Sequence, residues 1–145
     1  MTYVMYIVVD THVFNRALGG ISEYWDVLER IREQCNIIAC SKEIIKEYLG
    51  RARSGGMEQL IVQRKIEDLK QIKKVKVFKK SKCDHVNLRK IPSHQPDEKF
   101  VRVAVASSAR YIISKNKHLT DLNPYDFEDT HIEIIEPKEY LQKDC

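Results

Sequence analysis

The sequence predicts an α/β protein, a three-layer α/β/α sandwich with a mainly parallel central sheet. Short runs of Val and Ile alternate along the chain with segments whose apolar residues recur every three or four positions. The runs are typical of strands buried on both faces, and the periodic segments are typical of helices with one buried face. Strands that alternate with helices pair in parallel, since each helix carries the chain back across the sheet. The 145 residues are expected to form a single domain, residues 1–145.

The composition predicts a globular, cytoplasmic protein. Hydrophobic residues make up 43% of the chain and charged residues 32%, as in ordinary folded domains. No apolar run reaches the length of a membrane span, and the N-terminus lacks the pattern of a signal peptide. The four cysteines form no CxxC pair, so we expect reduced thiols and no disulfide framework.

The first predicted strand, residues 6–9, ends abruptly at Asp10, which Thr11 and His12 follow. Parallel sheets bind their ligands outside the carboxyl ends of the strands. Asp10 therefore stands where an α/β protein keeps its chemistry. A turn or helix-capping aspartate is the alternative interpretation of this residue.

Two helices and a strand follow. The first helix begins after Gly19 and Gly20, and its predicted apolar face consists of Ile21, Tyr24, Trp25, Leu28 and Ile31. A short buried strand spans residues 36–40, and Ser41 occupies the N-cap of the next helix, whose predicted buried face is Ile44, Ile45, Tyr48, Leu49 and Ala52. Glu43 points almost opposite that face and Glu47 lies near its edge, so Glu47 is the better candidate for a cleft.

The middle of the chain is basic. A third helix is marked by Val62, Ile66, Leu69 and Ile72, and residues 74–78 alternate like a strand near the sheet edge. From residue 64 to residue 90 Lys and Arg dominate, which indicates either a solvated face or a surface that attracts phosphate. Residues 82–95 are predicted to form a polar loop.

The last third supplies two more polar positions. Asp97 opens a helix, where an N-cap role is worth about 1 kcal/mol. A buried strand at residues 111–114 leads to Asn116 and the flanking Lys115 and Lys117. A last strand spans residues 130–135, and Pro137 precedes a short helix at residues 138–141.

The acidic positions predict a divalent-metal site. Asp10, Glu47, Asp97 and Asn116 all lie at or near predicted strand or helix ends, which parallel topology gathers on one rim of the sheet. Carboxylate and amide oxygens are the ligands that Mg²⁺ and Mn²⁺ prefer. The sequence contains no glycine-rich phosphate loop, and its cysteines and histidines are too sparse for a zinc site.

The sequence resembles the PIN-domain family of metal-dependent ribonucleases. The similarity is carried, in family order, by residues 7–14, 40–49, 97–100 with Ala104, 109–119 and 134–141. It spans nearly the whole chain but contributes little between residues 51 and 80. The family usually has an aspartate where this chain has Asn116, and often an asparagine where it has His12.

This resemblance implies an endoribonuclease that hydrolyses single-stranded RNA, similar to the toxins of toxin–antitoxin pairs. Asp10, Glu47 and Asp97 would hold Mg²⁺ or Mn²⁺ with Asn116 assisting, and Asp121 is a substitute ligand. Thr11, Lys115 and Lys117, with part of the basic stretch at residues 64–90, would contact the nucleic acid. A homodimer and an antitoxin partner are further implications.

Two alternatives to an enzyme stay open. The first is a catalytically degenerate PIN-like module that binds RNA or a protein partner, because Asn116 adds no negative charge. The second is a scaffold protein that assembles through the predicted apolar helix face at residues 21–31.

Overall fold

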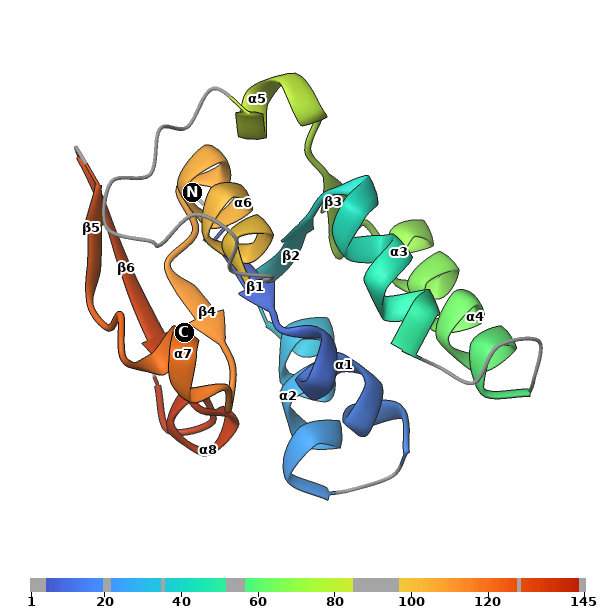
Figure 1. Ribbon diagram of the computed structural model, residues 1–145. Coiled ribbons are helices and arrows are strands. Elements are labelled where there is room, and N and C mark those ends of the chain that lie inside the picture. The colour runs from blue at the N-terminus through green and yellow to red at the C-terminus, as the bar shows by residue number, and fades with distance from the viewer. Residues whose placement is uncertain are drawn as a thin grey trace.

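The computed structural model describes residues 5–19, 22–34, 36–51, 57–84, 97–127 and 129–143. Its six-stranded sheet has the order β3-β2-β1-β4-β6-β5 and is parallel except for the antiparallel pair β5–β6 (Figure 1). The strands are β1 (Met5–Val9), β2 (Asn36–Cys40), β3 (Val75–Val77), β4 (Tyr111–Ile113), β5 (Tyr125–Phe127) and β6 (Thr130–Ile135). The helices are α1 (Thr11–Leu18), α2 (Ser22–Glu33), α3 (Lys42–Arg51), α4 (Met57–Gln71), α5 (Lys80–Asp84), α6 (Glu98–Ser107), α7 (Lys117–Thr120) and α8 (Pro137–Tyr140).

The register of the central strands sets the position of the polar residues that follow them. Ile7 of β1 pairs with Ile38 of β2 on one side and with Tyr111 of β4 on the other. One residue beyond the strand, the N–H of Asp10 donates to the carbonyl of Ile113 at 3.0 Å. The carboxyl ends of β1 and β4 are therefore level, as the sequence predicted for neighbouring parallel strands.

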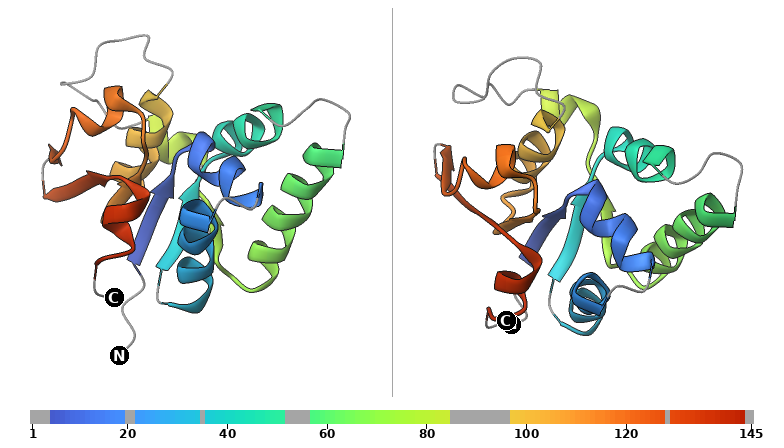
Figure 2. Two further views of the ribbon diagram at one scale, coloured as in Figure 1. Left: turned by 90° about the horizontal axis from the view of Figure 1, so that it is seen from below. Right: turned by 60° about the horizontal axis from the view of Figure 1, so that its bottom comes forward.

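Helices cover both faces of the sheet, which confirms the predicted three-layer architecture (Figure 2). Helix α6 packs on β1, β2 and β4, with α5 against it, whereas α2 packs on β2 from the other side. Helix α1 lies against α2 and α3, and α4 continues that row beyond α3. The first strand is thus covered by helices that come from distant parts of the chain.

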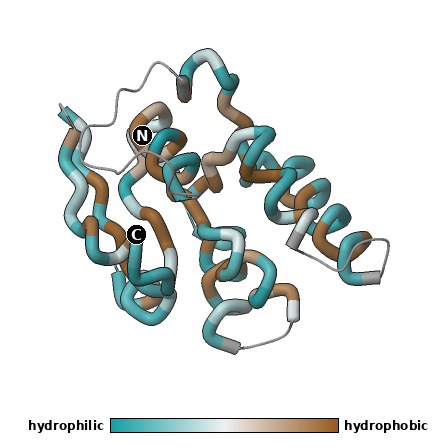
Figure 3. Tube along the Cα trace, viewed as in Figure 1, coloured by the Kyte–Doolittle hydropathy of each residue, from teal (hydrophilic) through white to brown (hydrophobic). Residues whose placement is uncertain are grey.

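The core is formed by the central strands and the inward faces of the helices (Figure 3). Val8, Val9 and Ile112 are completely buried, as expected for strands covered on both faces. The rings of Phe14 and Tyr48 stack with their centroids 4.3 Å apart, which joins α1 to α3 beside the end of β1.

Four short elements were not predicted from the sequence. Helix α1 follows Asp10 directly and buries Val13, Phe14 and Ala17, a pattern too short to separate from the end of the strand. Helix α7 is a single turn, and β5 has three residues that pair with β6. Helix α5 also replaces the start of the loop expected at residues 82–95, and residues 85–95 lie outside the described part of the chain.

Two residues of the predicted apolar helix faces are exposed. Trp25 is 39% exposed, and the ammonium group of Lys65 lies 5.4 Å from the centre of its ring. Ile72 follows the end of α4 and is 50% exposed. The helical spacing of apolar residues predicted the wrong environment for both side chains. Trp25 lies on the exposed side of α2, and α4 ends before Ile72. Ile21 and Ala52 lie outside the described residues.

Other sequence predictions for these elements are confirmed. Ser41 caps α3, because its hydroxyl accepts a hydrogen bond of 3.2 Å from the N–H of Ile44. β3 is an edge strand, and β6 has the predicted bounds. Within the described residues, every helix is too short or too polar to cross a lipid bilayer.

Candidate functional site

A cleft of about 820 Å³ lies at the carboxyl edge of the sheet. The β1–α1 junction, α3, α4, the start of α6 and the β4–α7 connection all contribute to its wall. Its described lining is Asp10, Thr11, His12, Asn15, Arg16, Leu18, Gly19, Glu47, Glu58, Ile61, Val62, Asp97, Lys115 and Asn116. The predicted site residues are among them except Lys117, which is exposed at the first position of α7, and the substitute ligand Asp121.

Asp10 is the most enclosed acid of the cleft, with 6% of its surface exposed. The hydroxyl of Ser114 donates a 2.8 Å hydrogen bond to its Oδ2 atom. Burial raises the pKa of the Asp10 carboxyl above its ordinary value, and the negative charges of Asp97 and Glu47 raise it further. The Ser114 hydrogen bond opposes this shift of the pKa. A cation next to Asp10 would stabilise its ionised form.

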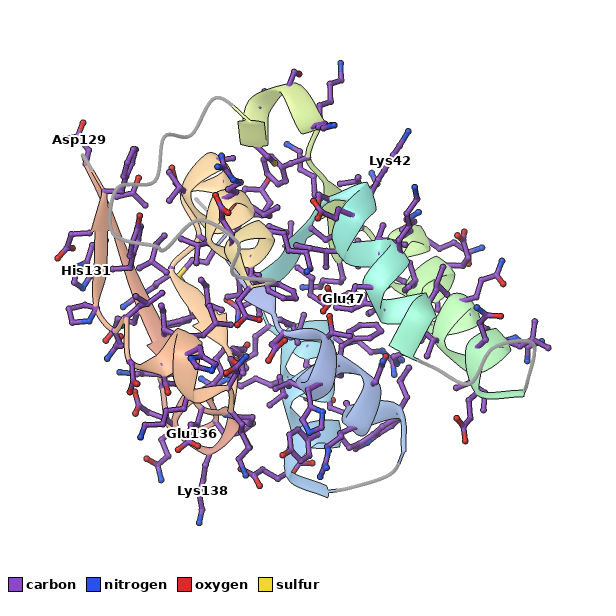
Figure 4. The ribbon with its side chains drawn as sticks, viewed as in Figure 1. Lys42, Glu47, Asp129, His131, Glu136 and Lys138 are labelled. Carbon is purple, nitrogen blue, oxygen red and sulfur yellow. The ribbon has the colours of Figure 1, made fainter. Side chains whose placement is uncertain are left out.

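Glu47 lies on the face of α3 that is turned toward α1 and β1, whereas Lys42 on the same helix points outward (Figure 4). The hydroxyl of Thr11 donates to Glu47 Oε1 at 2.8 Å, and the ammonium group of Lys99 forms an ion pair with Oε2. Both carboxylate oxygens therefore have a donor. Glu47 rather than the exposed Glu43 faces the cleft, as the position on the helix predicted.

Asp97 and Asn116 contact each other across the cleft wall. The Asn116 amide Nδ2 donates to Asp97 Oδ2 at 3.0 Å, and its Oδ1 accepts from the N–H of His118 at 3.0 Å. Asn116 is thus the N-cap of α7, a role that was not predicted. Its amide oxygen retains a second lone pair for another ligand.

The predicted capping role of Asp97 is wrong. Asp97 occupies the N-cap position of α6, but its carboxylate makes no capping hydrogen bond. Its backbone is helical (φ −88°, ψ −7°), whereas a capping side chain usually requires an extended residue. The Asp97 carboxylate is therefore directed to Asn116 and the cleft instead of to its own helix.

Three residues of the site were missed from the sequence. Ser114 follows β4 at the level of Asp10, so the strand register could have indicated it. Lys99 stands two residues after Asp97, but its contact with Glu47 depends on the packing of α6 against α3. Arg16 lies on the unpredicted helix α1.

Two basic side chains line the cleft near Tyr24. The guanidinium carbon of Arg16 and the Nζ atom of Lys115 lie 5.9 and 5.5 Å from the centre of its ring. Lys115 also lies 3.8 Å from a carboxylate oxygen of Glu23. The described part of the basic stretch, residues 64–84, contributes nothing to the described lining. The cleft therefore presents cations from α1 and the β4–α7 connection.

The donor chemistry of the cleft suits a hard divalent cation. Four carboxylates and two amides line the cleft: Asp10, Glu47, Glu58 and Asp97 with Asn15 and Asn116. Burial of Asp10 disfavours its ionised form, which a bound cation would stabilise. Within the described residues, no three His, Cys, Asp or Glu side chains lie close enough together to hold an ion as they stand. Asp121, the substitute ligand considered from the sequence, is exposed and outside the described lining.

The six-stranded, mainly parallel sheet between helices defines a PIN-like α/β fold, as the sequence predicted. A similar solved structure is that of VapBC2 from Rickettsia felis, bound to a DNA fragment from the VapBC2 promoter. The likeness has a TM-score of 0.56 at 15% sequence identity and covers 90% of this chain and 98% of that chain. No family model matches the sequence, and no curated protein does. The structural likeness establishes the fold.

Proposed function

We propose that this protein is a divalent-metal-dependent endoribonuclease that hydrolyses phosphodiester bonds in single-stranded RNA. The observation that carries the proposal is the convergence of Asp10, Glu47 and Asp97 in one cleft at the carboxyl edge of a PIN-like sheet. These acids come from three separate parts of the chain. A structural role alone gives no reason for three carboxylates to face the same space, because like charges repel.

The three carboxylates would hold Mg²⁺ or Mn²⁺, and Asn116 would add an amide oxygen. The ion, when bound, supplies a Lewis acid that polarises a phosphate and lowers the pKa of an attacking water. Ser114 keeps Asp10 oriented through its hydrogen bond. Asn116 does the same for Asp97, although it brings no negative charge of its own.

The RNA backbone would meet the basic side chains of the cleft. Arg16 and Lys115 line it on the side of Tyr24 and would neutralise phosphates next to the scissile bond. The exposed Lys117 would contact a phosphate farther along the strand. Thr11 is buried and its hydroxyl donates to Glu47, so it would orient this acid and would not contact the RNA backbone.

We further propose that the protein is the toxin of a toxin–antitoxin pair, acting in the cytoplasm as a homodimer. Support comes from the structural likeness to VapBC2, which was solved with promoter DNA. Exposed apolar side chains on α2 and α4 offer a surface for a protein partner: Trp25, Leu60 and Ile61. Exposed large apolar side chains can mark such contacts.

The test is cleavage of an end-labelled single-stranded RNA with Mn²⁺ or Mg²⁺, compared with EDTA and with Asp10→Asn. Metal-dependent cleavage that is lost in the variant would support the nuclease. A single-stranded DNA of the same sequence serves as the control for RNA preference. Binding of RNA without cleavage in either metal would contradict the enzyme.

A second candidate is a PIN-like module that binds RNA or a protein partner without catalysis. The favouring observation is that the acids already have partners inside the protein: Lys99 pairs with Glu47, and Asn116 donates to Asp97. In such a module the acids would serve folding. Asp10→Asn would then leave RNA or partner binding intact in the presence of EDTA.

A further inference from the structure

We propose that Lys99 is an internal counter-cation of the cleft, which competes with a divalent ion for the carboxylate of Glu47. This inference rests on the proposed metal-binding function and adds a control on it. In the metal-free protein, Lys99 would hold Glu47. An ion that takes Glu47 as a ligand must first displace the ammonium group.

The geometry of the ion pair carries the argument. Lys99 lies in the first turn of α6 and Glu47 in the middle of α3, two helices that pack together. Their side chains are only 12% and 22% exposed, so water screens the pair less than it would at an open surface. Thr11 donates to the other oxygen of Glu47, which fixes the orientation of the carboxylate.

The other acids of the cleft are held differently. Asp10 accepts from the neutral hydroxyl of Ser114, and Asp97 accepts from the neutral amide of Asn116. An ion that binds these two carboxylates does not have to displace a charged group from these contacts. Among the described ion pairs, Lys99–Glu47 is the one that joins a basic side chain to an acid lining the cleft.

Electrostatics supplies the reason for such a residue. Asp10, Glu47 and Asp97 line the same cleft, so their negative charges repel one another when no ion is bound. The ammonium group of Lys99, paired with Glu47, offsets part of this repulsion. The same contact opposes the uptake of the ion, because two cations cannot share one partly buried carboxylate at little cost.

The experiment measures Mn²⁺ binding by electron paramagnetic resonance, with no RNA present. Lys99→Gln is expected to bind Mn²⁺ about tenfold more tightly than the unaltered protein, within the usual range of coupling between two sites. Lys99→Arg keeps the charge and is expected to stay within about twofold of the unaltered protein. Lys99→Met is a second uncharged variant in case Lys99→Gln does not fold.

Two comparisons separate competition from a general change of charge. Lys115→Gln removes the same charge from the same cleft, but the Lys115 ammonium lies against Glu23 and Tyr24 instead. We expect a change of less than about threefold for it. In a Glu47→Gln background, Lys99→Gln should also gain less than about threefold, because the carboxylate they compete for is absent.

Each outcome bears on the proposal. A tenfold gain that requires Glu47 supports it. No gain in Lys99→Gln, or an equal gain with and without Glu47, overturns it while leaving the proposed nuclease intact if the unaltered protein binds Mn²⁺ and cleaves RNA. The absence of Mn²⁺ binding in all variants would overturn both proposals.

Discussion

The hydroxyl of Ser114 donates a 2.8 Å hydrogen bond to the carboxylate of Asp10 and joins the ends of two neighbouring parallel strands. The Ser114 hydroxyl oxygen also accepts a 2.9 Å hydrogen bond from the backbone N–H of Asn116. One buried serine thus links the first acid of the cleft to the residue that contacts Asp97. The arrangement of the cleft depends on this link.

Ser114→Ala should destabilise the protein by about 1–2 kcal/mol, because the buried Asp10 carboxylate loses a hydrogen-bond donor. The pKa of Asp10 should rise further, since the hydrogen bond from Ser114 lowers it. Urea denaturation at neutral pH measures the free energy of unfolding. Ser107→Ala is the matched control, because this buried hydroxyl contacts only a carbonyl of its own helix in the described hydrogen bonds. Equal losses in the two variants would contradict the special role of Ser114.

Asp10→Asn should stabilise the metal-free protein at neutral pH. The folded-state pKa of Asp10 lies above its ordinary value of 3.8, so the native state binds this proton more readily than the unfolded state does. Between the two pKa values stability falls as the pH rises, and above both the ionised carboxylate carries its full penalty. The gain from Asp10→Asn should therefore be present at neutral pH and shrink as the pH falls through the raised folded pKa towards 3.8.

Thermal unfolding in EDTA across this pH range tests that expectation. Asp26→Asn, at an exposed position on α2, is the control and should show no comparable dependence. A gain for Asp10→Asn that stays constant down to acid pH would contradict the role of burial.

Asp97→Asn should abolish RNA cleavage and change the free energy of unfolding by less than about 0.5 kcal/mol. The carboxylate does not cap α6, and an amide oxygen at this position can still accept from Asn116. Activity and urea denaturation are measured on the same preparation. Asp121→Asn, an exposed acid outside the described lining, should retain full activity. A loss of about 1 kcal/mol for Asp97→Asn would instead indicate that this carboxylate serves the stability of the fold.

Asn116→Asp should lower stability without metal and tighten metal binding. A carboxylate here still caps α7, but it faces Asp97 without an N–H to donate, so two like charges come together. We expect a loss of about 1–2 kcal/mol in EDTA that Mn²⁺ reverses. The melting temperature with and without Mn²⁺ measures this. A variant whose melting temperature responds to Mn²⁺ no more than the unaltered protein would contradict a metal site beside Asn116.

Arg16→Gln and Lys115→Gln should each weaken binding of single-stranded RNA and reduce its salt dependence. Each loss of a phosphate contact should lower the slope of log K against log salt by about 0.7. Lys79→Gln, on the exposed part of the basic stretch, is the control and should change neither value. If Lys79→Gln has the larger effect, the RNA lies along the basic stretch instead of in the cleft.

Local sequence patterns are sufficient to predict five of the six described strands and to place the first acid at the end of β1. A run such as Ile7–Val9 is typical of a parallel strand covered on both faces, and parallel topology then places Asp10 at the carboxyl edge of the sheet. The preference for Glu47 over Glu43 followed from helical geometry alone. The strands and the helix face of Glu47 depend on residues close together along the chain, so local sequence patterns are sufficient to predict them.

The partners of those acids depend on how distant segments of the chain pack together. The ion pair of Lys99 with Glu47 requires α6 to pack against α3, and the bond from Ser114 to Asp10 requires β4 to pair with β1. Asp97 illustrates the limit, since its place at a helix start predicted a cap and its backbone conformation excluded one. Side-chain contacts between distant segments depend on packing in three dimensions, which local periodicity does not record.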